Sequence, residues 1–446
     1  MWEQLTVWNG NYQKVMENNK DLNSRREFVK KTAVVCSGFP FLTRMTSSSS
    51  KPINQTPMKK PMQHSNGSMI GSYGQWAADL APDPPKLSFR NSKWQSVADW
   101  KPQAMEKAYE LLAPPKIGEV KVTVHRKYVF DGLDVEEISW QLPYGEPTKA
   151  VVLKPAGETK RLPAVLGLHD HGGVKYFGWE KICRISDNTR SMLTEHQSQY
   201  YEGRAWANEI AKKGYVVMVH DVFAFASRRV RLENVDGILW GHCSREVWED
   251  KDSAVDENIK DYNAWASDHE TIMAKSLLSA GTTWPGVVLA EDQVALTVLC
   301  EREDVDANRV GCCGLSGGGL RSAYLGGLDK RIKCAVCVGF MSTWRDFVMN
   351  KSFTHTFMTY ASLLPNYLDF PEILGLRTPL PALVQSSKED DLFTLLEMER
   401  ADKILREIYA KAGEKDKYKT NFYEGGHKFD IAMQTDAFNW FDKWLA

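Results

Sequence analysis

The chain has 446 residues, of which 43% are hydrophobic and 25% charged, as in an ordinary globular protein. Its formal net charge of -1 provides no basic excess to neutralise phosphates, which argues against nucleic acid and anionic membrane surfaces as partners. The length fits one elaborated α/β domain preceded by an N-terminal extension.

The N-terminus carries an export-like signal. Residues 24–30, Ser-Arg-Arg-Glu-Phe-Val-Lys, resemble the twin-arginine motif, and the apolar stretch at 32–42 is too short to span a membrane. We predict a signal region over residues 1–42, no membrane span, and delivery to the periplasm or the exterior. Met16 offers a more usual start than Met1, so the true start is predicted there.

The next stretch changes in composition. Residues 43–82 are rich in Ser, Pro, Met, Asn and Gly and are predicted to be a disordered linker, with the folded domain at 83–446. The domain is predicted to open with a helix at 101–112, with Pro102 in its first turn. Alternating patterns then predict antiparallel strands joined by turns. These strands are expected at 120–130, 135–142 and 150–153, with turns at Asp131-Gly132 and Tyr144-Gly145.

From there, apolar runs alternate with helical patterns, which predicts a doubly wound, mostly parallel sheet. Strands are expected at 162–168, 215–220, 309–313, 331–338, 381–385 and 418–423. Helices are expected at 200–213, 286–302, 318–328, 392–412 and 431–445, and a turn at 304–308. Residues 228–285 show no regular helix or strand pattern and form a Trp-containing insertion. Its role is left open, and a lid over the site is one alternative.

One of these strands runs into a glycine-rich turn with the pattern G-x-S-x-G. Gly314-Leu315-Ser316-Gly317-Gly318 fits the nucleophile elbow, in which a serine sits on a strained strand-to-helix turn. The helix that follows would direct its N-terminal N–H groups at the place where negative charge develops. The plainer interpretation is a glycine-rich turn without chemistry.

Two later strand ends carry the partners that a serine nucleophile needs. Asp390 follows the strand at 381–385 and His427 follows the last strand, which gives the chain order Ser, Asp, His. His427 would take the proton of Ser316, and the carboxylate would orient the imidazole. Singly, Asp390 reads equally well as a helix N-cap and His427 as a loop histidine. Asp391 is left open as the alternative acid.

The loop after the strand at 162–168 reads His169-Asp170-His171-Gly172-Gly173. We predict that the backbone N–H groups of Gly317 and Gly173 form an oxyanion hole. His171 and Arg228 are weaker candidates for substrate contacts, since arginines such as Arg228 are more often structural.

No metal or other cofactor is predicted. The histidines of that loop have no evident partner ligands elsewhere in the chain. Most of the eight cysteines, such as the pair Cys334 and Cys337, fall in predicted strands and helices and are expected to be buried free thiols.

At these residues the chain resembles the α/β-hydrolase superfamily, and within it the bacterial esterases grouped with acetyl xylan esterases and dienelactone hydrolases. The resemblance covers about residues 100–446. The segments that carry it are 169–173, 305–311, 314–319, Asp390 and 426–427. Dienelactone hydrolases use a cysteine nucleophile, so Ser316 departs from their pattern. Prolyl-peptidase relatives share the elbow but carry a β-propeller, for which the segment before the core strands has no room.

The resemblance implies an exported serine carboxylesterase that acts on small acyl esters or acylated saccharides, acetyl esters among them. Two alternatives stay open. One is a peptidase or amidase of the same fold, and the other is a catalytically silent carbohydrate-associated binding protein. The sequence does not determine the oligomeric state.

Overall fold

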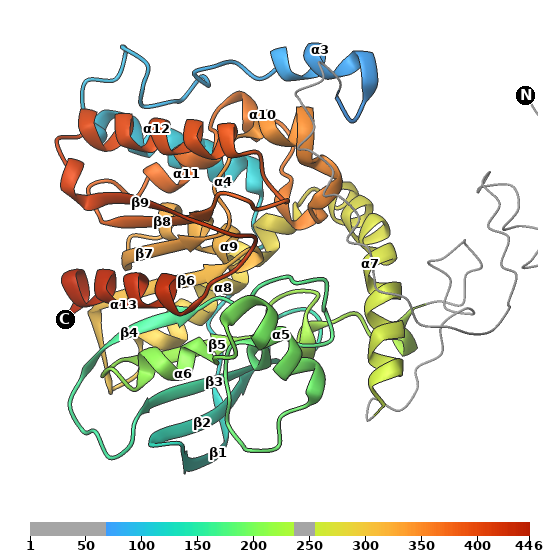
Figure 1. The fold of residues 1–446 in the computed structure, drawn as a ribbon, viewed down its shortest axis with the longest axis vertical. Coiled ribbons are helices and arrows are strands. Elements are labelled where there is room, and N and C mark those ends of the chain that lie inside the picture. The colour runs from blue at the N-terminus through green and yellow to red at the C-terminus, as the bar shows by residue number, and fades with distance from the viewer. Residues whose placement is uncertain (1–67, 236–254) are drawn as a thin grey trace, which may run out of the picture. The chain divides into compact units, whose positions relative to one another are not determined.

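The computed structural model describes residues 68–235 and 255–446 (Figure 1). The predicted signal region, the start at Met16 and residues 43–67 of the predicted linker lie outside the described residues, as do residues 236–254 of the insertion. No helix in the described ranges has the length and apolar character needed to cross a membrane.

Within the described residues, nine strands form one sheet in the order β1-β2-β3-β5-β4-β6-β7-β8-β9. The strands are β1 (Thr123–Phe130), β2 (Leu133–Trp140), β3 (Thr148–Pro155), β4 (Leu162–Gly167), β5 (Val216–His220), β6 (Val305–Leu315), β7 (Ile332–Val338), β8 (Ala382–Ser387) and β9 (Tyr418–Tyr423). Strands β4 to β9 pair in parallel, whereas β1, β2 and β3 pair antiparallel, and β3 also pairs antiparallel with β5. The prediction of a mostly parallel, doubly wound sheet behind antiparallel opening strands is confirmed.

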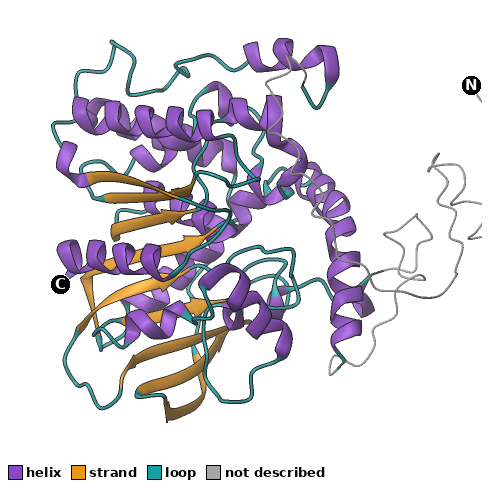
Figure 2. Cartoon of the chain, viewed as in Figure 1, coloured by secondary structure: helices purple, strands orange, loops and turns teal. Residues whose placement is uncertain are grey.

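Helices cover both faces of this sheet (Figure 2). Those with defined bounds are α3 (Gly74–Asp79), α4 (Val97–Leu112), α5 (Ser191–Tyr201), α6 (Trp206–Ala211), α7 (Asp256–Ser279), α8 (Trp284–Cys300), α9 (Gly317–Leu328), α10 (Trp344–Asp346), α11 (Phe370–Gly375), α12 (Leu395–Lys411) and α13 (Ile431–Leu445). Neighbouring strand residues point to opposite faces, so Cys312 packs in the cluster with α8, α9 and α12, and Cys313 in the cluster with α6 and α13. Both thiols are free and buried, as predicted.

The first hairpin turns where predicted. Asp131 and Gly132 both have positive φ, 50° and 74°, as a two-residue turn between antiparallel strands requires. The helix before it begins earlier than predicted, because the side chain of Ser96 accepts the backbone N–H of Asp99 as an N-cap. Pro102 therefore lies inside helix α4 rather than in its first turn.

The helix predicted at 200–213 is wrong, because two helices, α5 and α6, meet there. Glu202 and Gly203 interrupt the chain in the left-handed region, at φ 54° and 79°. Glu202 is the residue that ends helix α5, and its N–H and that of Gly203 both donate to the carbonyl of Gln197. Gly203 adopts the left-handed conformation without strain. The backbone carbonyl of Tyr200 then accepts the N–H of Phe429, which ties this helix end to the segment after β9.

Three further boundaries differ from expectation. The insertion at 228–285 was predicted to lack regular patterns, but it contains the 24-residue helix α7. Of the predicted turn at 304–308, residues 305–308 are strand, since β6 begins at Val305 and pairs there with Leu162 of β4. Residues 74–79, in the predicted linker, form helix α3, and the nearby Ser68 hydroxyl donates to the carbonyl of Val348 at 3.2 Å.

Candidate active site

The serine turn, residues 314–319, comprises the end of strand β6, Ser316 and the start of helix α9. Ser316 has φ 58° and ψ −117°, a strained conformation for a residue with a side chain. Two backbone hydrogen bonds of 2.9 Å hold it, one from the N–H of Ser316 to Val338 on β7 and one from the N–H of Leu320 to Ser316. Ser316 thus projects from the point where β6 becomes helix α9, which is the geometry of a nucleophile elbow.

Glycines make this turn possible. A Cβ atom on either Gly314 or Gly318 would overlap the carbonyl oxygen of Leu168, the residue after strand β4. A Cβ on Gly317 would lie 2.9 Å from the backbone nitrogen of His171. The serine turn therefore packs backbone to backbone against the loop that follows β4, which we call the β4 loop (residues 168–176).

His427 and Asp390 come together from two other strand ends. His427 Nδ1 lies 2.6 Å from Oδ2 of Asp390, whose side chain is 1% exposed. Because a carboxylate only accepts, Nδ1 carries a proton, so in the neutral imidazole the lone pair is on Nε2. Nε2 is buried and has no hydrogen-bond partner in the described part of the chain. Asp391, the alternative acid, is exposed, so the geometry favours Asp390.

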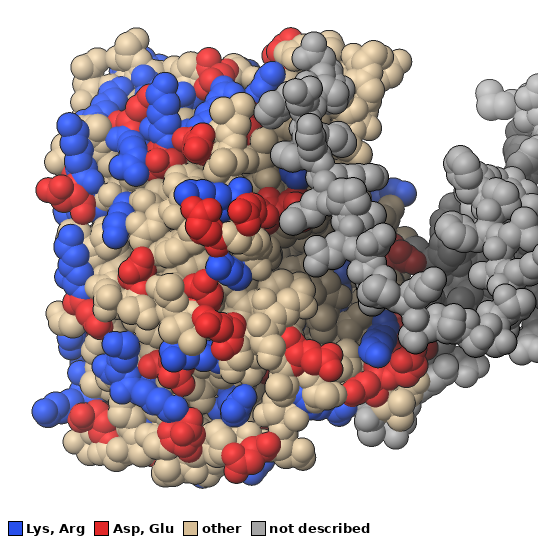
Figure 3. Space-filling model, viewed as in Figure 1, with Lys and Arg blue, Asp and Glu red and all other residues tan. Residues whose placement is uncertain are grey.

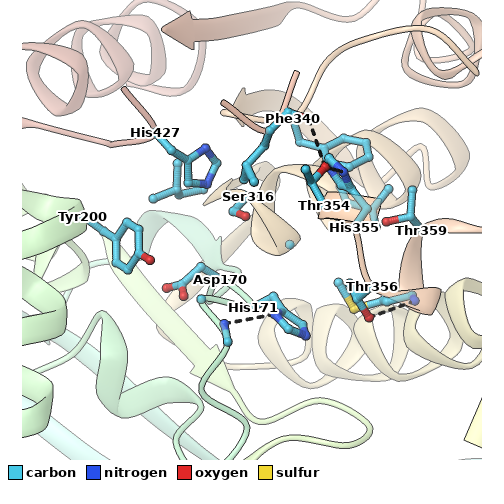
Figure 4. Close-up of a pocket in the computed structure, with 17 residues that line it drawn as sticks. Asp170, His171, Tyr200, Ser316, Phe340, Thr354, His355, Thr356, Thr359 and His427 are labelled. Atoms are coloured by element: carbon cyan, nitrogen blue, oxygen red, sulfur yellow. Dashed lines mark hydrogen bonds between the residues drawn. The ribbon is translucent and has the colours of Figure 1, made fainter. Parts of the chain in front are cut away.

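Ser316 and His427 line one cavity of about 270 Å³ (Figure 4). Part of its lining is apolar, and Leu315, Leu320, Phe340, Met358 and Leu392 form that part. The remainder is mostly polar and includes Asp170, His171, Tyr200, Thr354, His355, Thr356 and Thr359. Four of these polar residues belong to the wall segment (residues 352–359), which carries no motif and was not predicted from the sequence.

His355 of the wall segment is a neutral imidazole. Burial lowers its pKa to about 4, with the nearby His427 acting in the same direction and the carbonyl of Lys351 opposing it. Its Nδ1 lies 2.7 Å from the hydroxyl of Thr354, and Phe347 and Phe393 pack edge-on against its ring.

The backbone N–H groups of Gly173, the predicted oxyanion donor, and of His171 in the same loop have different surroundings. The N–H of Gly173 donates to Nδ1 of His171 at 3.1 Å, so it is used within its own loop. The N–H of His171 lies against Gly317 and has no hydrogen-bond acceptor among the described residues. As the first residue of α9, Gly317 also has an N–H without an intrahelical acceptor. Since almost every residue has a backbone N–H, no sequence signal distinguishes His171 from Gly173.

Buried charges hold the β4 loop in place. Lys181 is fully buried and donates from Nζ to the carbonyls of Asp170 and His171, both at 2.9 Å. Burial lowers the pKa of Lys181 to about 8, with the Asp170 carboxylate opposing that shift. Asp170 accepts from His196 Nε2 at 3.1 Å and from the hydroxyl of Tyr201. Burial opposes ionisation of Asp170, but His196 and Lys181 outweigh it and hold its pKa well below the usual range.

Arg228, predicted as a weak substrate contact, does not line this cavity. Its guanidinium donates to Oε1 of Glu291 at 2.8 Å and to the carbonyls of Tyr144 and Glu146. Its side chain is 2% exposed, so these contacts are structural. His171, the other candidate, does line the cavity.

The described ranges contain no cluster of three or more His, Cys, Asp or Glu side chains arranged to hold a metal ion. On the face drawn in Figure 3, acidic and basic side chains are intermingled.

Comparisons with known proteins agree with this architecture. No family model matches the chain. A curated protein named "Putative hydrolase YtaP" from Bacillus subtilis (strain 168) is 26% identical over 314 residues, which cover 70% of this chain and 88% of that protein.

Two solved structures that share this fold are described as esterases. A crystal structure described as a "putative acetyl xylan esterase" from Bacteroides fragilis NCTC 9343 matches with a TM-score of 0.59 and 17% identity, covering 81% of this chain and 84% of that one. A glucuronoyl esterase from Solibacter usitatus matches with a TM-score of 0.51 and 13% identity, covering 87% and 98%. The predicted resemblance to α/β-hydrolase esterases is thus confirmed at the level of the fold.

Proposed function

We propose that this chain of α/β-hydrolase fold is an exported serine carboxylesterase that cleaves small acyl esters, with acetyl esters of carbohydrates as its substrates. The observation that carries the proposal is the His427–Asp390 pair: Nε2 of its imidazole has no hydrogen-bond partner among the described residues, and His427 lines the same cavity as Ser316. The proposal of export depends only on the twin-arginine motif at residues 24–30.

The mechanism follows from the protonation states of the groups. His427 Nε2 accepts the proton of Ser316, and the serine oxygen attacks the ester carbonyl carbon. The N–H groups of Gly317 and His171 stabilise the resulting oxyanion. His427 then returns the proton to the departing alcohol, which leaves Ser316 acylated. A water activated by the same imidazole hydrolyses the acyl-enzyme, and Asp390 stabilises each imidazolium that forms.

The cavity supports a small acyl group. Its volume of about 270 Å³ is slightly below the usual range for ligand sites, and apolar side chains cover part of its lining. The carbohydrate part of the proposal is supported by two structural neighbours, one described as a "putative acetyl xylan esterase" and the other as a glucuronoyl esterase.

The test is hydrolysis of p-nitrophenyl acetate by the full chain and by Ser316→Ala, with fluorophosphonate labelling of both. We expect serine-dependent turnover and labelling of the wild type alone. Acetylated xylooligosaccharides, methyl glucuronate and an aminoacyl p-nitroanilide then separate an acetyl esterase from a uronate esterase and an amidase. A folded wild type that is neither labelled nor active would refute the esterase and favour the silent binding protein.

A further inference from the structure

Glu270, on helix α7 of the insertion, joins two walls of the cavity. Its Oε1 accepts from Nε2 of His171 at 3.1 Å and from Nζ of Lys175, both in the β4 loop. Its Oε2 accepts from the hydroxyl of Thr356 at 2.7 Å and from the N–H of Phe357 at 3.3 Å, both in the wall segment. The side chain is buried, so one carboxylate satisfies four donors from two otherwise separate segments.

This carboxylate fixes the tautomer of His171. A backbone N–H only donates, so the bond from Gly173 makes Nδ1 the acceptor, and the bond to Glu270 places the proton on Nε2. The ring is therefore held on both sides, and the β4 loop is closed on itself at the residue whose own N–H lies against Gly317. Figure 4 shows His171 and Thr356 along the same edge of the cavity.

The same face of α7 makes further contacts with the β4 loop. The side-chain oxygen of Asn263 accepts the N–H of Tyr176 at 2.9 Å, and the carbonyl of Ala266 accepts from Nζ of Lys175 at 3.3 Å. Asn263, Ala266 and Glu270 are three and four residues apart, which places them along one side of a helix. These two contacts hold helix α7 against the β4 loop in addition to the four bonds of Glu270.

The charge on Glu270 is favoured in this setting. Burial opposes its ionisation, but His171 and Lys175 outweigh burial and hold the pKa of Glu270 at about 2. Burial also lowers the pKa of His171, with Lys175 acting in the same direction and Glu270 opposing, which agrees with a neutral imidazole. The pair Lys175–Glu270 therefore carries the ionic part of the contact, and His171 contributes a neutral hydrogen bond.

We propose that Glu270 is a positioning residue for the esterase reaction, which holds the His171 N–H in the oxyanion hole and fixes the wall segment opposite. This inference rests on the proposed function. It assigns a role to the insertion, whose helix α7 fixes the shape of the catalytic cavity. A residue with this role changes turnover through the β4 loop and substrate binding through Thr356.

The experiment compares Glu270→Ala, Glu270→Gln and Thr356→Val with the wild type in p-nitrophenyl acetate hydrolysis. The turnover rate is divided by the concentration of sites that a fluorophosphonate labels at completion, so that misfolded protein is excluded from kcat. Glu270→Ala is expected to lower kcat about 100-fold, the cost of one lost oxyanion donor. It should also raise KM about fivefold, because it removes the acceptor of the Thr356 hydroxyl as well. Thr356→Val removes the hydroxyl that donates to Glu270 and accepts the N–H of Met358, and it leaves the bonds of Glu270 to the β4 loop intact. It should raise KM about fivefold while kcat is retained.

Glu270→Gln provides the rescue. Its amide oxygen can accept from His171 and Lys175, but its NH₂ group faces the N–H of Phe357, which cannot accept. The kcat of Glu270→Gln should therefore be about tenfold higher than that of Glu270→Ala. The control is Glu257→Ala, because Glu257 lies on the same helix but its side chain is 73% exposed.

If Glu270→Ala had the same kcat per labelled site as the wild type, this inference would be overturned. The proposed esterase function would still stand. A kcat loss in Glu270→Gln equal to that in Glu270→Ala would also overturn it, because the β4 loop contacts would then not matter. A wild type that shows no Ser316-dependent turnover would overturn the proposed function and this inference with it.

Discussion

The serine turn and the β4 loop face the same cavity, but different interactions hold them. The serine turn depends on backbone: three glycines and two main-chain hydrogen bonds of 2.9 Å set the conformation of Ser316. The β4 loop depends on buried charged side chains, Lys181 and Glu270, which come from segments outside it. A site of this kind combines one half that its own local sequence builds with another half that tertiary contacts build.

The difference determines what a substitution does. Around Ser316 a change affects the reacting groups directly, whereas in the β4 loop it acts through the position of one backbone N–H. Substitutions around Ser316 should therefore lower kcat by several orders of magnitude. Substitutions that affect the β4 loop should lower kcat by about as much as the loss of one hydrogen bond to the oxyanion.

The largest expected effect is at Asp390. Asp390→Asn removes the carboxylate that fixes the proton of His427 on Nδ1, and kcat should fall roughly 10⁴-fold, as expected when the imidazole takes the wrong tautomer. Asp391→Asn is the matched control, because Asp391 is adjacent but exposed and should keep activity within about twofold of wild type. The measurement is kcat for p-nitrophenyl acetate. If Asp391→Asn lost more kcat than Asp390→Asn, the carboxylate that orients His427 would be Asp391 and not Asp390.

A smaller loss is expected at Lys181, on the side of the β4 loop. Lys181→Met removes one donor from each of the carbonyls of Asp170 and His171 and leaves the Asp170 carboxylate without a cation 3.7 Å away. We expect kcat to fall about 100-fold and the free energy of unfolding to fall by about 3–5 kcal/mol, as when one partner of a buried pair is removed. Activity assays and urea unfolding measure the two quantities.

Lys212→Met is the control for Lys181. Lys212 forms an ion pair with Asp131 at 2.6 Å, but both side chains are more than one third exposed, so its loss should cost about 1 kcal/mol or less. If Lys181→Met and Lys212→Met behaved alike, the β4 loop would not depend on buried charge, and the contrast between the two halves of the site would fail.

The same contrast explains what the sequence could predict. The serine turn, the order of Ser316, Asp390 and His427, and the parallel sheet are all expressed in short motifs and local patterns. Glu270 contacts His171 across 99 positions of the chain, and no spacing rule connects the two. The oxyanion prediction placed the second donor at Gly173 because glycine permits close approach, but that N–H is already bonded to His171.

Two errors in the fold have local causes. Helix α7 was missed because polar residues interrupt its pattern, although buried positions such as Ile259, Tyr262 and Ala266 recur three and four residues apart. The break between α5 and α6 did have a signal, Gly203, which the apolar periodicity on both sides obscured.

The smallest effect is expected at His355 in the wall segment. Burial there keeps the imidazole uncharged, whereas the buried charges that hold the β4 loop are paired. His355 takes up a proton near pH 4 in the folded protein but near 6.5 when unfolded, so the unfolded chain binds more protons between these values. The stabilisation from neutral His355 is therefore fully present above pH 6.5 and is lost as the pH falls toward 4. The full loss is about 3 kcal/mol from a shift of this size.

The variant His355→Phe suits the aromatic surroundings and removes the titration. We expect urea unfolding to show that the wild type loses up to about 3 kcal/mol of stability relative to His355→Phe as the pH falls from 7 to 4. His125→Gln, at an exposed histidine of strand β1, controls for histidine loss in general and should follow the wild type. Parallel pH profiles for the wild type and His355→Phe would mean that the wall segment tolerates the imidazolium, as the β4 loop tolerates its paired charges.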